Sequence, residues 1–384
     1  MEQILKETGR QLAHINDITP KQALRRAFKT LAGKRVSPQD PVFWPAGMLM
    51  LGLVEAGDKG DGSECHLNPK VTFRTVPFVT YLDAWIDAGA RVMHTDDALA
   101  GYVLVRLYAL TGEERYLKAA EKIYAFLQSA PKDVEGSIIY HPEIGEDNRI
   151  IYADGAGMTA LFLAAYGRQT RNEDATELAR TQVANFLQYG MDEKTGLPYH
   201  AYDLASGEKL GIVGWGRAVG WLMMGMSELV KADEKGDGGD KGDGSECHLN
   251  PKVTFRTVPF VTSFFDRVVS YLRADGSFAW QLPAMEGHAD TSATAMIGWA
   301  MLNAGTGDKM DGSECHLGVS GDIQNRPFCH LASIRDYLLS QTHDGVVTSA
   351  LGECVDYGQY PQVYGTYPWG QGAVCAFLAR LSRR

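Results

Sequence analysis

The stretch that decides the fold is Ala153–Gly167, which reads ADGAGMTALFLAAYG. It opens on an acidic residue, Asp154, and continues with small and apolar residues on nearly every side of the helix that it predicts. A helix without a polar face is buried on all sides, and its Gly and Ala residues let neighbouring helices approach closely. The stretch therefore predicts an inner helix of a larger helical assembly, with Asp154 at its opening.

Five further stretches share this pattern of an aromatic or acidic opening followed by a small, apolar helix. They are Phe43–Gly57, Thr95–Gly112, Trp215–Val230, Asp290–Gly305 and Trp369–Leu381. Amphipathic helices, with apolar residues at helical spacing, precede or separate them. These are Pro20–Leu31, a helix ending near Trp85–Ala88, Glu113–Ala130, Asn172–Gly190, Phe264–Leu272 and Leu331–Leu339. Polar outer helices around six apolar inner helices predict an all-α (α/α)6 barrel, one catalytic domain over residues 1–384.

An open α-solenoid is the competing arrangement, because it also stacks pairs of helices. Its repeats are usually shorter and more uniform, at about 34 to 47 residues. A closed ring gathers the openings of its inner helices at one end, where a pocket forms. The openings of this chain carry Asp, His, Arg, Trp and Tyr, which suits a carbohydrate-cleaving site. A helical scaffold without enzymatic activity would not need those residues there.

The charge balance limits the partners that this protein can bind. The net charge is −10 and the pI is about 5.5, which argues against nucleic acid and anionic membranes because both attract a basic surface. A small anionic ligand is compatible with it, since one arginine can hold such a ligand. The sequence leaves the oligomeric state open.

The N-terminal stretch MEQILKETGRQLAHI has no apolar core of a signal peptide. No apolar run in the chain reaches the roughly 18 residues of a membrane span. The six cysteines show no CxxC motif and no compact disulfide spacing. From these features we expect a cytoplasmic protein.

One sequence block is duplicated within the chain. Gly57–Thr80 is repeated identically at Gly239–Thr262, and a shorter copy stands at Gly307–Leu317. Diverged structural repeats do not keep exact identity while their neighbours drift, so we treat these copies as an anomaly and assign them no function. Each copy contains adjacent Cys and His residues, which is an unusual spacing for metal ligands. We therefore expect no metal site.

Two of the openings carry carboxylates that could act in catalysis. Asp154 has Tyr152 before it and Gly155 after it, which indicates a carboxyl group facing an aromatic-lined space. The alternative interpretation is a helix N-cap, for which Asp is among the best residues. Asp96 and Asp97 open the second inner helix, and both cannot face the pocket. One of them, together with Asp154, would form the carboxylate pair that glycoside chemistry uses.

Further candidates for substrate binding lie at the other openings. His200 is part of the segment GLPYHAYD, and Trp44 opens the first inner helix. Arg217 stands between Trp215 and Trp221 in WGRAVGW. A buried arginine needs an anion, which is either an internal Asp or a substrate carboxylate. The two tryptophans are either core residues or a platform for stacking a sugar.

Four motifs, in this order, resemble a known family: YADGAGMTALFLA, GLPYHAYD, WGRAVGWLMMGM and DTSATAMIGWAML. They look like glycoside hydrolase family 105, the unsaturated rhamnogalacturonyl hydrolases, which share fold and chemistry with the family 88 unsaturated glucuronyl hydrolases. The resemblance runs from about Phe43 to the C-terminus, without the duplicated stretches. It implies an (α/α)6 barrel, in agreement with the helix pattern. It also implies that no metal or organic cofactor takes part.

The resemblance implies a small anionic oligosaccharide substrate with a 4,5-unsaturated uronic acid at its non-reducing end. Asp154 then protonates C4 of the double bond, and water attacks C5. Asp96 matches the second acidic position better than Asp97, because Gly101 then falls at the expected helix glycine. The matched substrate-binding residues are Tyr152, His200, Trp215, Arg217 and Trp221.

The family suggests rhamnose as the leaving sugar, and so pectin (rhamnogalacturonan) as the source. One alternative is an unsaturated glucuronyl hydrolase that acts on other uronate oligosaccharides. Another is a different (α/α)6 sugar enzyme, such as an N-acylglucosamine epimerase-like isomerase or an inverting endoglucanase. An epimerase would place several histidines around the pocket, and an endoglucanase would need an open cleft.

Overall fold

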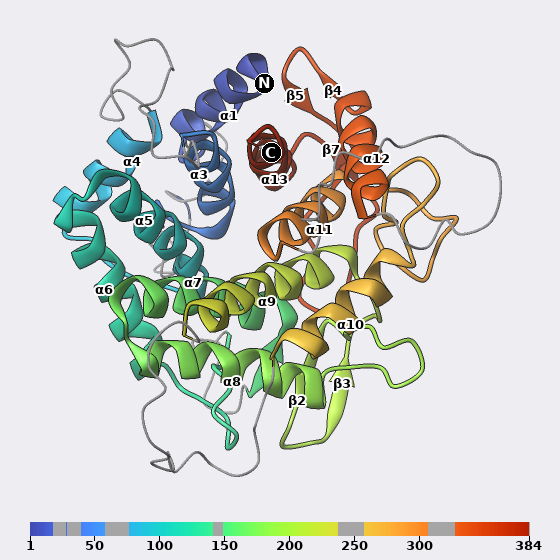
Figure 1. Cartoon of the computed structure of the whole chain (residues 1–384), viewed down its shortest axis with the longest axis horizontal. Coiled ribbons are helices and arrows are strands. Elements are labelled where there is room, and N and C mark those ends of the chain that lie inside the picture. Colours follow the sequence, from blue (N-terminus) through green and yellow to red (C-terminus); the bar gives the residue numbers. More distant parts are fainter. Residues whose placement is uncertain are drawn as a thin grey trace.

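The structure is a computed structural model that describes residues 1–17, 28, 40–57, 77–140, 149–236, 257–305 and 327–383. Six predominantly apolar helices form its centre (Figure 1). They are α3 (Trp44–Gly57), α5 (Ala98–Thr111), α7 (Ala153–Thr170), α9 (Gly216–Gly236), α11 (Thr291–Asn303) and α13 (Pro368–Leu381). These bounds agree closely with the inner helices that the sequence predicts.

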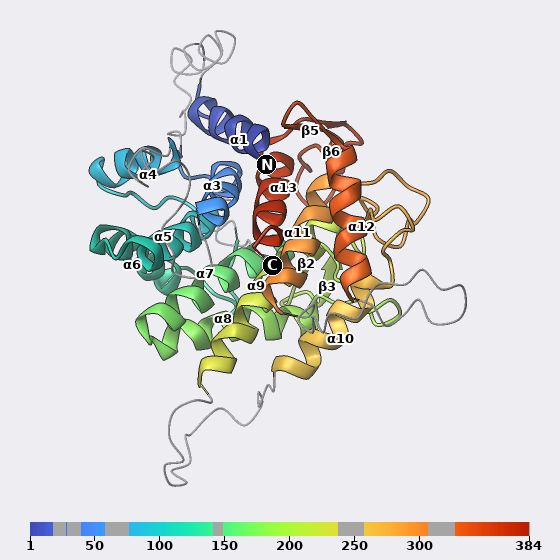
Figure 2. The ribbon, with the colours of Figure 1, turned by 45° about the horizontal axis from the view of Figure 1, so that its top comes forward.

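The six inner helices form a closed ring. Each of them contacts the next along the chain, and α13 packs against α3 to close the circle. Figure 2 shows α13 in its place between α3 and α11. The last helix of an open solenoid would not return to the first, so the (α/α)6 barrel is confirmed.

The outer helices are amphipathic and surround this ring. They are α1 (Glu2–His14), α4 (Pro77–Asp87), α6 (Glu114–Ser129), α8 (Glu173–Tyr189), α10 (Thr257–Val269) and α12 (Pro327–Ser340). The N-terminal helix α1, which the sequence analysis did not include among the outer helices, packs against α3 and α13. The predicted helix Pro20–Leu31 lies outside the described residues, apart from residue 28. None of the described helices is long and apolar enough to cross a membrane.

The duplicated block lies largely outside the described residues. Its two long copies are described only at their ends, and the identical ends Pro77–Thr80 and 259–262 lie in the first turns of α4 and α10. The shorter copy, Gly307–Leu317, lies entirely outside.

Short strands connect the helices at one end of the barrel. Strands β1 (Ile150–Tyr152), β2 (Ala201–Asp203) and β3 (Glu208–Leu210) form an antiparallel sheet. Strands β4 (Thr342–His343) and β5 (Val346–Val347) form one hairpin, and β6 (Ala350–Leu351) pairs with β7 (Tyr364–Gly365). Because β1 runs directly into α7 and pairs with β2, the opening of α7 lies beside the segment that carries His200. The backbone N–H of Ala153 donates to the His200 carbonyl at 2.9 Å.

Glycines allow the inner helices to touch backbone to backbone. A Cβ atom on Gly157 of α7 would lie 2.3 Å from the backbone of Trp221 in α9. Where the ring closes, a Cβ atom on Gly372 of α13 would lie 2.3 Å from the carbonyl oxygen of Met48 in α3. Neither neighbour is a flexible side chain that could move away. An added methyl group would therefore push the helices apart.

We expect Gly372→Ala to lower the free energy of unfolding by about 1–3 kcal/mol, because overpacking at a fixed backbone contact forces the helices to shift. The matched control is Gly358→Ala, where an added Cβ atom meets nothing within 4 Å. That control should stay within about 0.5 kcal/mol of the wild type. Urea unfolding of both variants measures the difference. Equal midpoints would show that the ring tolerates a wider α3–α13 spacing.

The turn before α5 is held by a buried acid. This turn is the 3-10 helix η2 (Thr95–Asp97), and Asp97 is fully buried. Its Oδ2 accepts the backbone N–H groups of Met93 at 2.8 Å and His94 at 3.4 Å. Burial, with the carboxyl group of Asp40 beside it, raises the pKa of Asp97 to about 9. Asp97 thus folds the turn as a neutral acid. The N-cap residue of α5 is Asp97, not Thr95 or Asp96.

Asp97→Asn should make the protein less sensitive to alkaline pH. A carboxyl group whose pKa is raised on folding stabilises the fold below its unfolded pKa of about 4, and this stabilisation is lost as the pH rises towards 9. Asn imitates the neutral acid at every pH. The stability of the variant relative to the wild type should therefore improve by about 1–3 kcal/mol between pH 5 and pH 8. Parallel pH profiles of the urea midpoint would contradict this.

Candidate active site

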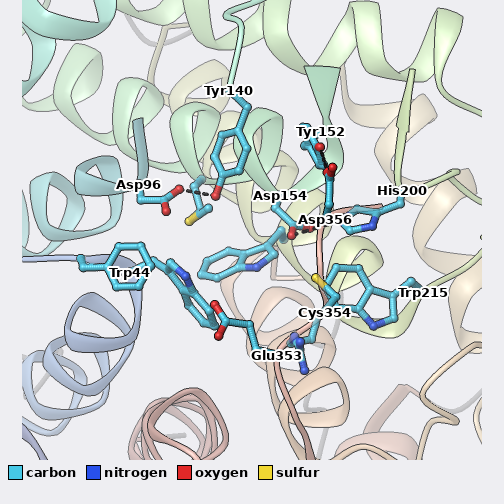
Figure 3. Close-up of a pocket in the computed structure, with 14 residues that line it drawn as sticks. Trp44, Asp96, Tyr140, Tyr152, Asp154, His200, Trp215, Glu353, Cys354 and Asp356 are labelled. Atoms are coloured by element: carbon cyan, nitrogen blue, oxygen red, sulfur yellow. Dashed lines mark hydrogen bonds and ion pairs between the residues drawn. The ribbon is translucent and has the colours of Figure 1, made fainter. Parts of the chain in front are cut away.

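A cavity of about 210 Å³ opens among the N-terminal ends of the inner helices (Figure 3). Every site residue selected from the sequence lines this cavity: Trp44, Asp96, Tyr152, Asp154, His200, Trp215, Arg217 and Trp221. Sequence reasoning missed the other lining residues, which are Phe43, Tyr140, Met158, Glu353, Cys354 and Asp356. Residues far apart in the chain thus meet in one pocket, and Asp97 is not among them.

Asp154 does not cap the helix that it opens. The N-cap of α7 is Tyr152, and Asp154 makes no capping hydrogen bond. Its Oδ1 atom is buried without a hydrogen-bond partner among the described residues, and its Oδ2 atom lies 3.5 Å from Nε2 of His200. Asp290 shows the contrast, because its Oδ1 caps α11 by accepting the N–H of Ser292 at 2.9 Å. A structural capping role therefore explains Asp290 but not Asp154.

The second carboxylate, Asp96, is 4% exposed and accepts a hydrogen bond from the hydroxyl group of Tyr140. Burial, followed by the negative charges of Asp96 and Asp154, raises the pKa of Tyr140 well above its usual value. Tyr140 therefore stays protonated and serves as a donor. The Tyr140 ring can reach Asp96 because the residue after Asp154 in α7 is a glycine. A Cβ atom on this residue, Gly155, would lie 2.5 Å from the Tyr140 ring.

His200 is enclosed by aromatic rings and is 1% exposed. Its ring lies 4.4 Å from that of Trp215 and 5.4 Å from that of Tyr152, measured between centroids. Its Nδ1 atom lies 2.7 Å from the hydroxyl oxygen of Tyr360. The ring is thus fixed with one nitrogen towards Tyr360 and the other towards Asp154.

Arg217 is buried, and the protein supplies its anion. Its Nη1 and Nη2 atoms donate to the carbonyl oxygens of Leu351 at 2.7 Å and Gly352 at 2.9 Å. Nη1 also lies 3.8 Å from Oδ2 of Asp290. Of the two anions that the sequence allowed, the internal Asp is present. The guanidinium still lines the cavity, so contact with a substrate carboxylate remains open to it.

Tryptophan rings form much of the apolar wall. The indole of Trp44 lies edge-on to Trp221 at 6.4 Å and close to Trp369 at 5.0 Å. Trp215 packs against the Arg217 guanidinium at 4.6 Å. Trp215 is thus a support for Arg217 and His200, whereas Trp44 and Trp221 form a corner of the pocket.

The loop between β6 and β7 supplies the lining residues that have no counterpart in the predicted helix openings. It brings Glu353, Cys354 and Asp356 to the cavity (Figure 3). Asp356 accepts a hydrogen bond from the hydroxyl group of Tyr152. Burial and the charge of Asp154 raise the pKa of the Cys354 thiol to about 12, so this thiol is neutral. This part of the loop has the sequence GECVDYG. It contains acidic residues, but no periodic pattern of apolar residues that would have predicted its place at the site.

Within the described ranges, no three His, Cys, Asp or Glu side chains come together in a way that would hold a metal ion. The charged and titratable groups of the pocket include four acids, a histidine and an arginine among aromatic rings. Such a set can transfer protons and position water or a sugar.

The comparisons with known proteins agree with this arrangement. The sequence matches glycosyl hydrolase family 88 over residues 15–384. Unsaturated rhamnogalacturonyl hydrolase YesR of Bacillus subtilis is 24% identical over 347 residues, which cover 88% of each chain.

Two solved structures share the barrel. A Salmonella enterica serovar Paratyphi A protein, described as a possible member of family GH105, has a TM-score of 0.71 at 16% identity, covering 99% of this chain and 93% of that one. An unsaturated glucuronyl hydrolase of Bacillus sp. GL1 has a TM-score of 0.64 at 16% identity, covering 91% and 89%. The family match spans nearly the whole chain, which excludes the epimerase, endoglucanase and scaffold alternatives. The protein is therefore a glycoside hydrolase that belongs to glycosyl hydrolase family 88.

Proposed function

We propose that this enzyme releases a 4,5-unsaturated uronic acid from the non-reducing end of oligosaccharides left by polysaccharide lyases. The observation that carries the proposal is the placement of Asp154. It presents a carboxylate with a buried Oδ1 atom and no capping bond to an aromatic-lined pocket, with Asp96 in the same cavity. Proton transfer to substrate is the chemistry that such a carboxylate can perform.

The size of the cavity favours the end of a sugar chain. Its volume of about 210 Å³ is below the roughly 300–1,000 Å³ of pockets that enclose larger ligands. One terminal sugar ring suits this space, and the rest of the chain would extend outside. The substrate carboxylate would lie near Arg217, the one Arg or Lys side chain among the lining residues that the structure describes. The N-terminal ends of the inner helices add partial positive charge at the same end of the barrel.

The proposed reaction is the hydration of a vinyl ether. Asp154 donates its proton to C4 of the C4=C5 bond, and positive charge develops at C5. The conjugate base of Asp154 takes a proton from water, whose oxygen bonds to C5 and forms a hemiketal. The hemiketal opens by breaking the bond between C5 and the ring oxygen. The hemiacetal left at C1 then expels the leaving sugar as an alcohol. One water molecule is consumed in total, and Asp154 regains its proton.

We propose rhamnose as the leaving sugar, and therefore pectin-derived rhamnogalacturonan fragments as the substrate. The support for this choice is the sequence likeness to YesR, at 24% identity. The alternative is an unsaturated glucuronyl hydrolase, the activity named for one structural neighbour. A cytoplasmic location also stays a proposal.

The ultraviolet absorbance of the unsaturated uronate reports the reaction directly, because hydration removes the conjugated double bond. Unsaturated rhamnogalacturonan disaccharide should lose this signal fastest, ahead of unsaturated galacturonyl and glucuronyl disaccharides. Faster loss with a glucuronyl substrate would select the alternative. No loss with any of the three would overturn the proposed function.

Asp154→Asn should keep the fold and lower kcat by about 10² to 10⁴-fold, the usual effect of removing a general acid. The control is Asp203→Asn on strand β2 of the neighbouring sheet, whose carboxylate accepts, among the described residues, only the local backbone N–H of Ala205. Thermal unfolding checks that both variants are folded. Activity near the wild-type value in Asp154→Asn would remove Asp154 from the role of acid.

Arg217→Lys should raise KM about tenfold or more and also lower the thermal midpoint. Lysine keeps the positive charge but loses the planar fork that donates to Leu351 and Gly352 and faces the pocket. Steady-state kinetics and thermal unfolding separate the two effects. A lower midpoint with an unchanged KM would mean that Arg217 serves the fold alone.

A further inference from the structure

The residues around His200 fix the orientation of its ring. Which ring nitrogen carries the hydrogen depends on one neighbour, Tyr360. Trp215 and Tyr152 enclose the ring through aromatic contacts, and these contacts do not distinguish the two nitrogens. Nε2 faces Asp154 at 3.5 Å. Nδ1 faces the hydroxyl group of Tyr360 at 2.7 Å. If the Tyr360 hydroxyl donates to Nδ1, a neutral imidazole carries its hydrogen on Nε2. If Nδ1 donates to the Tyr360 hydroxyl, the hydrogen is on Nδ1.

The hydroxyl group of Tyr360 is arranged to donate. The backbone N–H of Ile212 points to its oxygen at 3.5 Å and uses one of its lone pairs. Among the described residues, the acceptor within hydrogen-bond distance of this hydroxyl is Nδ1 of His200. Burial raises the pKa of Tyr360, so the proton stays on the phenol oxygen over the working pH range. The phenol proton therefore points to Nδ1.

Tyr360 itself is held in place. Its ring packs against Trp215 at 5.5 Å and Trp280 at 6.0 Å. Gly211 makes the approach possible: at this residue φ is +79°, and a Cβ atom would lie 2.8 Å from the Tyr360 hydroxyl and 2.7 Å from Cβ of His200. The loop between β6 and β7, which carries Tyr360, is also joined to β1 by the hydrogen bond that the Tyr152 hydroxyl donates to Asp356.

We propose that Tyr360 is a positioning residue that holds His200 as the neutral tautomer with hydrogen on Nε2, directed at Oδ2 of Asp154. The inference rests on the proposed function of Asp154 for its catalytic meaning. Once Asp154 has given its proton to C4, the Nε2–H group stabilises the resulting carboxylate until that carboxylate takes a proton from water. His200 itself neither gains nor loses a proton. The distance of 3.5 Å shortens as the carboxylate forms, as catalytic hydrogen bonds do in the working complex.

The test replaces Tyr360 by Phe, which keeps the ring packing and removes only the hydroxyl group. The matched control is Tyr357→Phe on the same loop, because the hydroxyl group of Tyr357 has no hydrogen bond among the described residues. We expect kcat to fall about 10- to 100-fold in Tyr360→Phe, the size of effect seen when a supporting partner of a histidine is removed from metal sites. The KM of Tyr360→Phe should change less than about twofold. The kcat and KM of Tyr357→Phe should also stay within about twofold of the wild-type values.

The decisive measurement is ¹⁵N NMR of histidine-labelled enzyme without substrate, with His200 assigned by its absence in His200→Gln. The wild type should show a protonated Nε2 and an unprotonated Nδ1, and Tyr360→Phe should show a mixture. A wild-type His200 with hydrogen on Nδ1, or an unchanged tautomer in Tyr360→Phe, overturns the proposal. The wild-type spectrum alone decides if Tyr360→Phe does not fold. Because no turnover is needed, this result is independent of the substrate panel that tests the proposed function.

Discussion

The closure of the inner helices into a ring is the constraint on which the rest of the structure depends. Six helices can meet around one axis only if their backbones come close, and Gly157, Gly225 and Gly372 provide the contacts without side chains. An outer helix returns the chain between each inner helix and the next, so the inner helices run in the same direction (Figure 1). Their N-terminal ends, and the residues just before them, are therefore gathered at one end, and the pocket forms there.

Parallel helices also separate charge between the two ends of the barrel. Their C-terminal ends carry partial negative charge, and the far end holds buried acids among cations: Glu55 bonds to Arg380 and Arg383, and Glu228 pairs with Arg168. Burial alone would raise the pKa of Glu228, but Lys231 and Arg168 lower it to about 2. The pocket end has the opposite helix polarity, which suits the role proposed for Asp154, an acid that becomes an anion near an anionic sugar.

The sequence predicted what depends on periodicity. Apolar helices leave a clear pattern in the sequence, and this pattern identified the helix openings that carry Asp154 and Arg217. His200 was selected from the segment between these two helices. Adjacent Asp96 and Asp97 were harder to separate, since their directions depend on a tight turn. The Asp97 side chain is buried beside Asp40 and stabilises the turn, whereas the Asp96 side chain lines the pocket. The loop between β6 and β7 has no period, and its place in the pocket follows only from long-range contacts.

Those contacts converge on Arg217. Its guanidinium binds the carbonyl oxygens of Leu351 and Gly352, where β6 passes into the loop, while Asp290 accepts the backbone N–H of Leu351 at 3.1 Å and lies beside Arg217. One buried cation thus joins α9, the cap of α11 and the start of the loop. The loop in turn presents Tyr360 to His200 and Asp356 to Tyr152. A group that binds Arg217 from the pocket would therefore act on the same loop that holds His200, the neighbour of the proposed catalytic acid Asp154.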